Sequence, residues 1–149
     1  MKIIVMKQHD QHWDAFAQQI QSVTWTAGRH LAHLMYNHAF LDWERVIVFS
    51  DHGQLVGFCA LLEHDIVPAV QSPFVGYVFV NNSYRGQGLS EQLVSRAETL
   101  AQQLGFDTTY IVTRHVGLYE RLGYELFDHR QDRFGRENRM LMKSLKLMS

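Results

Sequence analysis

A strand that runs through a glycine-containing turn into a long helix is the sequence feature that most limits the fold. Val, Phe and Tyr dominate residues 74–80, which predicts a buried strand. A polar loop with Gly86 and Gly88 follows, and an apolar stripe then predicts a helix that begins at Leu89 and stops at Gly105. Because the first N–H groups of a helix have no partner within it, this junction can bind an anion such as a pyrophosphate.

The rest of the chain alternates between the periodicities of helices and strands. The predicted order is β-α-α-β-β-β-α-β-α-β-β, which indicates a mixed α/β fold with a central sheet and flanking helices. No linker rich in Pro, Gly or Ser divides residues 1–149, so we expect one domain. The other expected strands are 3–5, 45–49, 55–62, 108–113, 124–128 and 139–145, and the other expected helices are 13–23, 31–39 and 116–122.

Composition excludes several classes of function. Of 149 residues, 46% are apolar, which suffices for a buried core, and 14 basic residues against 15 acidic ones argue against a broad nucleic-acid surface. The single cysteine, Cys59, cannot form an internal disulfide. No apolar run approaches the ~20 residues of a membrane span. The apolar stretch at the start of the sequence is too short for a secretory signal. We therefore expect a cytoplasmic protein.

Two motifs resemble those of the GCN5-related N-acetyltransferases (GNAT). The glycines fit neither a dinucleotide fingerprint, because Glu91 stands at the third glycine position, nor a P-loop, which needs Gly-Lys-Ser/Thr. Residues 85–90, Arg-Gly-Gln-Gly-Leu-Ser, resemble the Arg/Gln-x-x-Gly-x-Gly/Ala signature of that family, with Ser90 in place of the last Gly or Ala. Residues 118–125, Leu-Tyr-Glu-Arg-Leu-Gly-Tyr-Glu, resemble its second motif. The order of elements is similar over essentially the whole chain.

This resemblance implies a fold and a cofactor. It implies the GNAT fold: a mostly antiparallel twisted sheet of about six to seven strands whose splayed pair, near Val80 and Val112, admits acetyl-CoA. The pantetheine arm is expected to pair with the backbone of Val78, Phe79 and Val80. The pyrophosphate is expected on the amides of Arg85, Gly86, Gln87, Gly88, Leu89 and Ser90.

The implied reaction is direct transfer of an acetyl group to a primary amine of a small molecule or peptide. Tyr119 matches the family's general acid, which would protonate the leaving thiolate. Three other functions stay open: a catalytically silent acyl-CoA sensor, a transferase for another acyl-CoA, and an interaction domain. A homodimer is common in such a family. The sequence does not single out the general base, and its candidates are Glu63, His64, Asp65 and His115.

Several other residues have competing structural and functional interpretations. Cys59 lies in an apolar run, which favours a buried residue over a nucleophile. His30, His33 and His38 lack the spacing and the further ligands of a metal site, so we expect no metal. Trp25, His30 and Tyr36 are weak candidates for the acceptor site. The charged residues of 130–139 are typical of a solvated hairpin loop, although they could touch an acidic substrate or a dimer mate.

Overall fold

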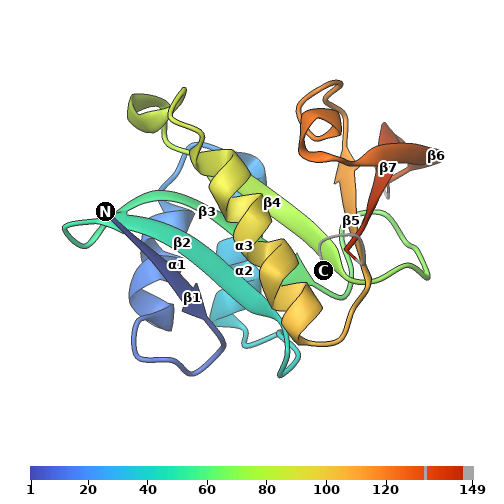
Figure 1. Ribbon diagram of the computed structural model, residues 1–149. Helices are drawn as coiled ribbons and strands as arrows, with labels where there is room; N and C mark the ends of the chain where they lie inside the picture. Colours follow the sequence, from blue (N-terminus) through green and yellow to red (C-terminus); the bar gives the residue numbers. More distant parts are fainter. Residues whose placement is uncertain (133, 146–149) are drawn as a thin grey trace.

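One sheet of seven strands runs through the molecule, and every neighbouring pair is antiparallel except β4 and β5 (Figure 1). The structure, a computed structural model, describes residues 1–132 and 134–145. The strand order is β1-β2-β3-β4-β5-β7-β6. The strands are β1 (Lys2–Met6), β2 (Arg45–Asp51), β3 (Gln54–Leu62), β4 (Phe74–Val80), β5 (Thr108–Thr113), β6 (Glu125–Gln131) and β7 (Glu137–Ser144). The helices are α1 (Trp13–Gln21), α2 (Thr26–Tyr36) and α3 (Leu89–Gln103), with short 3-10 turns η1 (Asn82–Tyr84) and η2 (Glu120–Leu122).

The helices cover both faces of the sheet. In Figure 1, α3 crosses one face, while α1 and α2 lie behind the other. On the first face Leu93 and Ala97 of α3 are fully buried among strand side chains, and on the second Ile20 and Leu31 are. These residues belong to the apolar stripes of the sequence, because one face of each helix must leave water.

The structure confirms the predicted fold class. It is a mixed α/β fold with a mostly antiparallel sheet, helices on both sides and one parallel strand pair. The element order agrees with the prediction except for one helix. Within the described residues no helix is long and apolar enough to cross a membrane.

The predicted helix over residues 116–122 is wrong. Only Glu120–Leu122 forms a short 3-10 turn, and the residues before it are an irregular loop. Gly117 has a φ of 98° and Gly123 also has a φ of 98°, both in the left-handed region that interrupts a right-handed helix.

Two other boundaries differ from expectation. Helix α2 begins at Thr26, five residues earlier than predicted, and ends before the predicted end at Ala39. Strands β6 and β7 extend into the charged segment 130–139, so that only the residues between Gln131 and Glu137 connect them. Charged side chains can occupy these strands because β6 is an edge strand with one face toward water.

Strands β4 and β5 touch at one end only. Their ladder contains one residue pair, Phe74 with Tyr110, and it is followed by no further pairing along the described strands. Strand β4 also carries a bulge on its side toward β3. Two of its residues, Tyr77 and Val78, lie opposite the single residue Cys59 of β3. Tyr77 has a φ of 55°, which a bulky residue rarely adopts. The bulge and the missing pairs turn the far half of β4 away from β5.

Replacing Gly57 by Ala should destabilise the end of β4 that forms the site. A Cβ at Gly57 would lie 2.7 Å from the carbonyl oxygen of Phe79 and 3.3 Å from Cα of Val80, and backbone atoms cannot move aside cheaply. We expect a loss of about 1–3 kcal/mol in the free energy of unfolding, measured in urea. Ser95→Ala on the exposed face of α3 is the control and should change little. An unchanged midpoint for Gly57→Ala would contradict this packing.

Candidate active site

The first turn of α3 has no side chain that caps it. The N-cap of the helix is Gly88, with a left-handed φ of 74°. Ser, Thr or Asp at this position would normally accept a hydrogen bond from the first turn. Glycine leaves those amides, and the positive end of the helix dipole, available to a ligand.

The loop before α3 is held in place from both sides. The Asn81 amide donates to the Val56 carbonyl at 2.8 Å, and the Tyr84 hydroxyl donates to the Asp51 carboxylate at 3.2 Å. Arg85 donates through Nε to the carbonyl of Val80 at 3.0 Å. That bond fixes the guanidinium beside the end of β4 while its terminal nitrogens keep their donors.

A cleft of about 620 Å³ joins this loop to the parted strands. The structure brings together eight of the nine residues predicted to bind the cofactor, whereas Gln87 is exposed outside the cleft. Their roles as ligands stay predictions. The lining residues are Thr24, Trp25, Val78, Phe79, Val80, Tyr84, Arg85, Gly86, Gly88, Leu89, Ser90, His115, Leu118 and Tyr119.

Tyr119 stands where this cleft meets a second hollow of about 650 Å³ and lines both. The side chain is 8% exposed and packs edge-on against Tyr124, with ring centroids 6.4 Å apart. Burial, helped by the nearby Cys59 and Asp65, raises the pKa of Tyr119 to about 12. The phenol therefore holds its proton at neutral pH, as a proton donor must.

Aromatic rings form one wall of the second hollow. Trp25 lines it and stacks on Phe79, with centroids 5.6 Å apart, and Phe79 in turn stacks on Phe58 at 5.1 Å. His30 lies against Tyr77 on the same side, with centroids 6.1 Å apart. Trp25 and His30 both line this hollow, whereas Tyr36 is an exposed residue outside it; that the hollow receives the acceptor stays a prediction.

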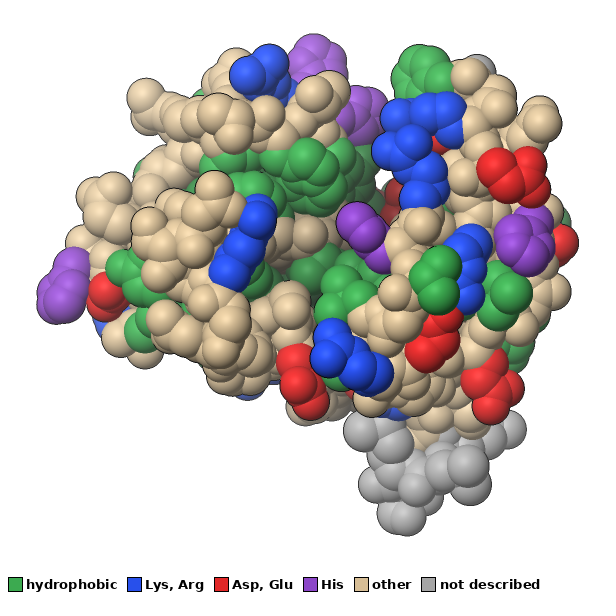
Figure 2. All heavy atoms as spheres, turned by 90° about the horizontal axis from the view of Figure 1, so that it is seen from above, with side chains coloured by type: hydrophobic (Ala, Val, Ile, Leu, Met, Phe, Trp, Pro, Cys, Tyr) green, Lys and Arg blue, Asp and Glu red, His purple; other side chains and the backbone are tan. Residues whose placement is uncertain are grey.

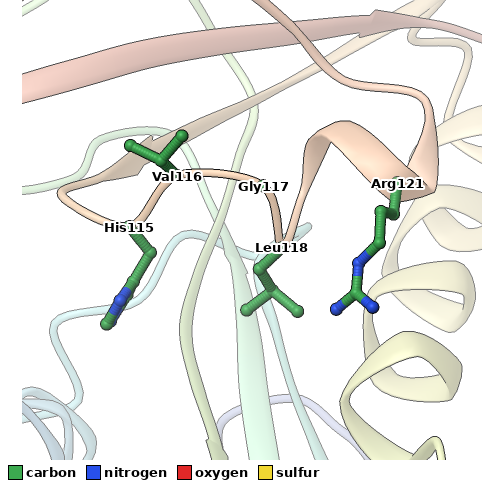
Figure 3. Close-up of a pocket in the computed structure, with 5 residues that line it drawn as sticks. All are labelled: His115, Val116, Gly117, Leu118 and Arg121. Atoms are coloured by element: carbon green, nitrogen blue, oxygen red, sulfur yellow. The ribbon is translucent and has the colours of Figure 1, made fainter.

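The loop after β5 forms the opposite wall. His115 lines both cavities, and Figure 3 shows its side chain, with those of Leu118 and Arg121, on one side of the loop while Val116 points away. Arg139 on β7 holds this loop: its Nη1 donates to the His115 carbonyl, and its Nη2 pairs with Glu120, each at 2.6 Å.

Asp65 occupies space that a side chain at Gly76 would need. A Cβ at Gly76 would lie 2.5 Å from Oδ2 of Asp65, while Oδ1 accepts a 2.6 Å hydrogen bond from the Ile66 amide. Gly76 and Ile66 both line the second hollow. Burial raises the pKa of Asp65 to about 6, against the opposing hydrogen bond from Ile66. The pKa of this carboxylate, beside the bulge, therefore lies closer to neutral pH than that of an exposed aspartate.

The other residues singled out in the sequence lie elsewhere. The side chains of Glu63 and His64 are 44% and 68% exposed, with Oε2 and Nε2 3.5 Å apart, and neither residue lines the cavities. Cys59 is fully buried, as expected, and burial raises its pKa far above the usual range of a thiol. His38 stacks on His9, with centroids 4.8 Å apart. In the part of the chain that the structure describes, no three ligating side chains could hold a metal ion.

The family is decided by a direct match. The model of the Acetyltransferase (GNAT) domain family matches residues 42–126, which run from just before β2 into β6 and include both motifs and the open start of α3. The chain belongs to the GNAT acetyltransferase family. The segments 85–90 and 118–125 both lie within the matched region.

Relatives and solved structures agree with this GNAT assignment. The uncharacterized N-acetyltransferase YhbS of Escherichia coli is 31% identical over 101 residues, which are 66% of this chain and 59% of that relative, so the chain spans less than two thirds of its length. A crystal structure of Escherichia coli YhbS with CoA superposes with a TM-score of 0.70 at 23% identity, covering 97% of this chain and 82% of that one. The aminoglycoside 6'-N-acetyltransferase from Enterococcus faecium superposes with a TM-score of 0.71 at 16% identity, covering 97% of each chain. These superpositions show the same fold.

Some residues of this GNAT site escaped the sequence analysis. Arg114 and Phe134 line the second hollow, and the sequence does not single them out. Arg136 lines it too, and it belongs to the charged segment 130–139, which is interpreted from the sequence as a solvated loop that could touch an acidic substrate or a dimer mate. Gly76 did leave a signal, since a glycine inside a strand often marks a bulge or a close approach. The partner that approaches it, Asp65, comes from a different segment and could not be named from that signal.

Replacing Asp65 by Asn should stabilise the protein above pH 6. Because the folded-state pKa is about 6 and the ordinary value is 3.8, folding favours the protonated acid. That contribution is complete below about pH 4 and is lost as the pH rises through about 6. Asn is neutral and keeps an acceptor for the Ile66 amide. We expect Asp65→Asn to gain about 1–3 kcal/mol over wild type near pH 8 and little near pH 4, by urea unfolding.

The control for this comparison is Glu63→Gln, a half-exposed carboxylate two residues away, which should show no such pH dependence. If Asp65→Asn were instead less stable than wild type near pH 8, the carboxylate would have a stabilising partner, and its burial would not govern its titration.

Proposed function

We propose that this GNAT protein is an acetyl-CoA-dependent N-acetyltransferase that transfers an acetyl group directly to a primary amine. The observation that carries the proposal is the continuity of the site: the open start of α3, the parted edge of β4, Tyr119 and the second hollow follow one another. A cofactor can enter at one end and an acceptor at the other. The CoA bound to Escherichia coli YhbS, a protein of the same fold, supports CoA as the carrier.

The backbone of β4 would hold the pantetheine arm. Because β5 does not pair with β4 beyond Tyr110, the β4 edge between Val78 and Val80 has groups that the amides of pantetheine can satisfy. The pyrophosphate would lie on the amides of residues 86–90, beside the guanidinium of Arg85. The thioester would then lie near Tyr119.

One amide of β4 is oriented to stabilise the oxyanion. The Asn81 amide donates to Val56 on the β3 side. Since successive N–H groups of an extended chain point to opposite edges, the amide of Val80 faces the open side. A donor there would stabilise the negative charge that develops on the thioester oxygen.

Proton transfers complete the reaction. An alkyl ammonium has a pKa of about 10.4 and must lose a proton before it attacks. We propose that Asp65 accepts this proton, directly or through a water, because its carboxylate lies beside the wall of the second hollow. We call this second hollow the acceptor hollow, since the acceptor would bind there. The amine nitrogen then bonds to the carbonyl carbon, the C–S bond breaks, and the Tyr119 hydroxyl gives its proton to the sulfur of CoA. The nitrogen, which carries a positive charge after its attack, loses its second proton to the Tyr119 phenolate through water, so that a neutral amide and a neutral phenol result.

Substitution at Gly88 should weaken cofactor binding. Val at this position would strain a left-handed backbone and place a branched side chain over the open amides of α3. We expect wild type to bind acetyl-CoA in isothermal titration calorimetry and Gly88→Val to bind at least about tenfold more weakly.

Gly105→Val is the matched control, because Gly105 has a φ of 94° in open space at the other end of the same helix. It should lose similar stability but keep the affinity. If wild type binds no CoA ester, the transferase proposal fails and an interaction domain remains.

Tyr119→Phe should separate an enzyme from a sensor. The variant keeps the ring packing against Tyr124 but cannot protonate the thiolate, so kcat should fall by about 10- to 100-fold with little change in acetyl-CoA affinity. The assay is CoA release from an amine panel, followed against pH. Asp65→Asn is the companion variant: wild-type kcat/KM should fall as the pH drops below about 6, and Asp65→Asn should be slow throughout. An unchanged rate in Tyr119→Phe would contradict its role as the acid.

A further inference from the structure

The acceptor hollow has cationic side chains on one wall. Two of its lining residues, Arg114 and Arg136, carry a fixed positive charge, and none of its described lining residues is Asp or Glu. Figure 2 shows Lys and Arg side chains gathered along one margin of a central hollow, across from a hydrophobic patch. The formal net charge of −1 for the whole chain gives no sign of this local positive charge.

Arg136 is held by a buried carboxylate. Its Nε lies 2.9 Å from Oδ2 of Asp132, whose side chain is fully buried. Burial alone would raise the pKa of Asp132, but hydrogen bonds from the Arg136 and Phe134 amides and from Asn138 outweigh it and hold the pKa at about 2. Asp132 therefore stays ionised and orients the guanidinium. The Arg136 Nη groups make no hydrogen bond to any described residue, so they can still donate to a ligand.

Arg114 is a second, unpaired cation on the same wall. It is exposed and, among residues 1–132 and 134–145, has neither an ion pair nor a hydrogen bond from its side chain. Its backbone position is fixed, because the adjacent His115 donates its amide to Thr113 Oγ1 at 3.0 Å and accepts from Arg139. The nearby cation Arg139 is already neutralised by Glu120. The Arg136 guanidinium lies over the Phe134 ring, with Cζ 5.3 Å from the ring centroid, so the wall offers Arg114 and the Nη edge of Arg136.

The two arginines do not belong to the cofactor end. Arg85 lines the cleft at the start of α3, whereas Arg114 and Arg136 line only the second hollow. The carboxylate beside that hollow, Asp65, is next to Gly76 of β4, while the arginines come from the end of β5 and the β6–β7 connection. The hollow therefore has a basic end suited to an anion, whereas at its other wall the Asp65 carboxylate lies beside Gly76 without lining the hollow itself.

We propose that the acceptor is an amine that also carries a carboxylate, such as an amino acid or a short peptide with a free C-terminus. This inference rests on the proposed transferase function. Arginine binds planar carboxylates through two parallel hydrogen bonds, and both arginines repel a polycation. Trp25 and Phe134 line the same hollow and offer apolar surface to the rest of the acceptor. The chain thereby differs from the acceptor chemistry named for its structural neighbours, aminoglycosides and spermidine.

The test compares matched acceptors that differ only in the carboxylate. Phenylalanine, leucine, methionine and lysine are each paired with the corresponding α-carboxamide, and spermidine is added as a polycation. With saturating acetyl-CoA, we expect wild-type kcat/KM to favour the acids by about tenfold or more. Arg114→Gln and Arg136→Gln should reduce that preference through KM, and Arg114→Glu should reverse it toward the carboxamides.

A control variant and the possible outcomes of the assay decide whether the proposal holds. Arg96→Gln, a change of the same kind on the exposed face of α3, should leave the preference intact. Equal or better rates with carboxamides or spermidine would overturn the inference, as would arginine variants that affect both members of a pair equally. If no amine reacts, calorimetry of each pair with the CoA-bound protein decides, and equal binding overturns it. Loss of acetyl-CoA binding itself would instead refute the proposed function.

Discussion

The early end of pairing between β4 and β5 is the constraint on which the rest of the site depends. One pair, Phe74 with Tyr110, joins the two halves of the sheet, and beyond it each strand presents an unpaired edge. Such an edge is unfavourable when buried without a partner, so the fold must keep it accessible to a ligand. Packing below the opening makes this tolerable: Phe74 is fully buried, and the rings of Tyr110 and Phe127 pack around it.

The bulge in β4 links this opening to the chemistry. Tyr77 takes a left-handed φ, and Gly76 beside it leaves room for the carboxylate of Asp65. A partly buried carboxylate with a pKa of about 6 lowers stability at neutral pH but gains the ability to accept a proton there. Strain and unfavourable charge are thus concentrated at the one wall where an acceptor amine would react.

The net charge of the whole chain does not show where its charged side chains gather. A nearly balanced composition suggests no preferred partner, yet the hollow has a carboxylate beside Gly76 and two arginines on the opposite wall. The hairpin segment first interpreted as a solvated loop is largely strand, and it contains the fully buried Asp132. Asp132 accepts hydrogen bonds from the Phe134 and Arg136 amides and from Nε of Arg136, which fixes the geometry of this charged hairpin.

The sequence by itself determined the order of elements, the glycine turn into α3 and the family, because these depend on local periodicity and on backbone conformations that glycine permits. It misjudged residues 116–122, where Gly117 interrupts a helical pattern, and it left four candidates for the base. Only the tertiary structure brought Asp65 beside Gly76 and set Arg114 and Arg136 on one wall. These juxtapositions join segments far apart in the chain, and the sheet register and the bulge that create them arise from packing across strands, which no local pattern encodes.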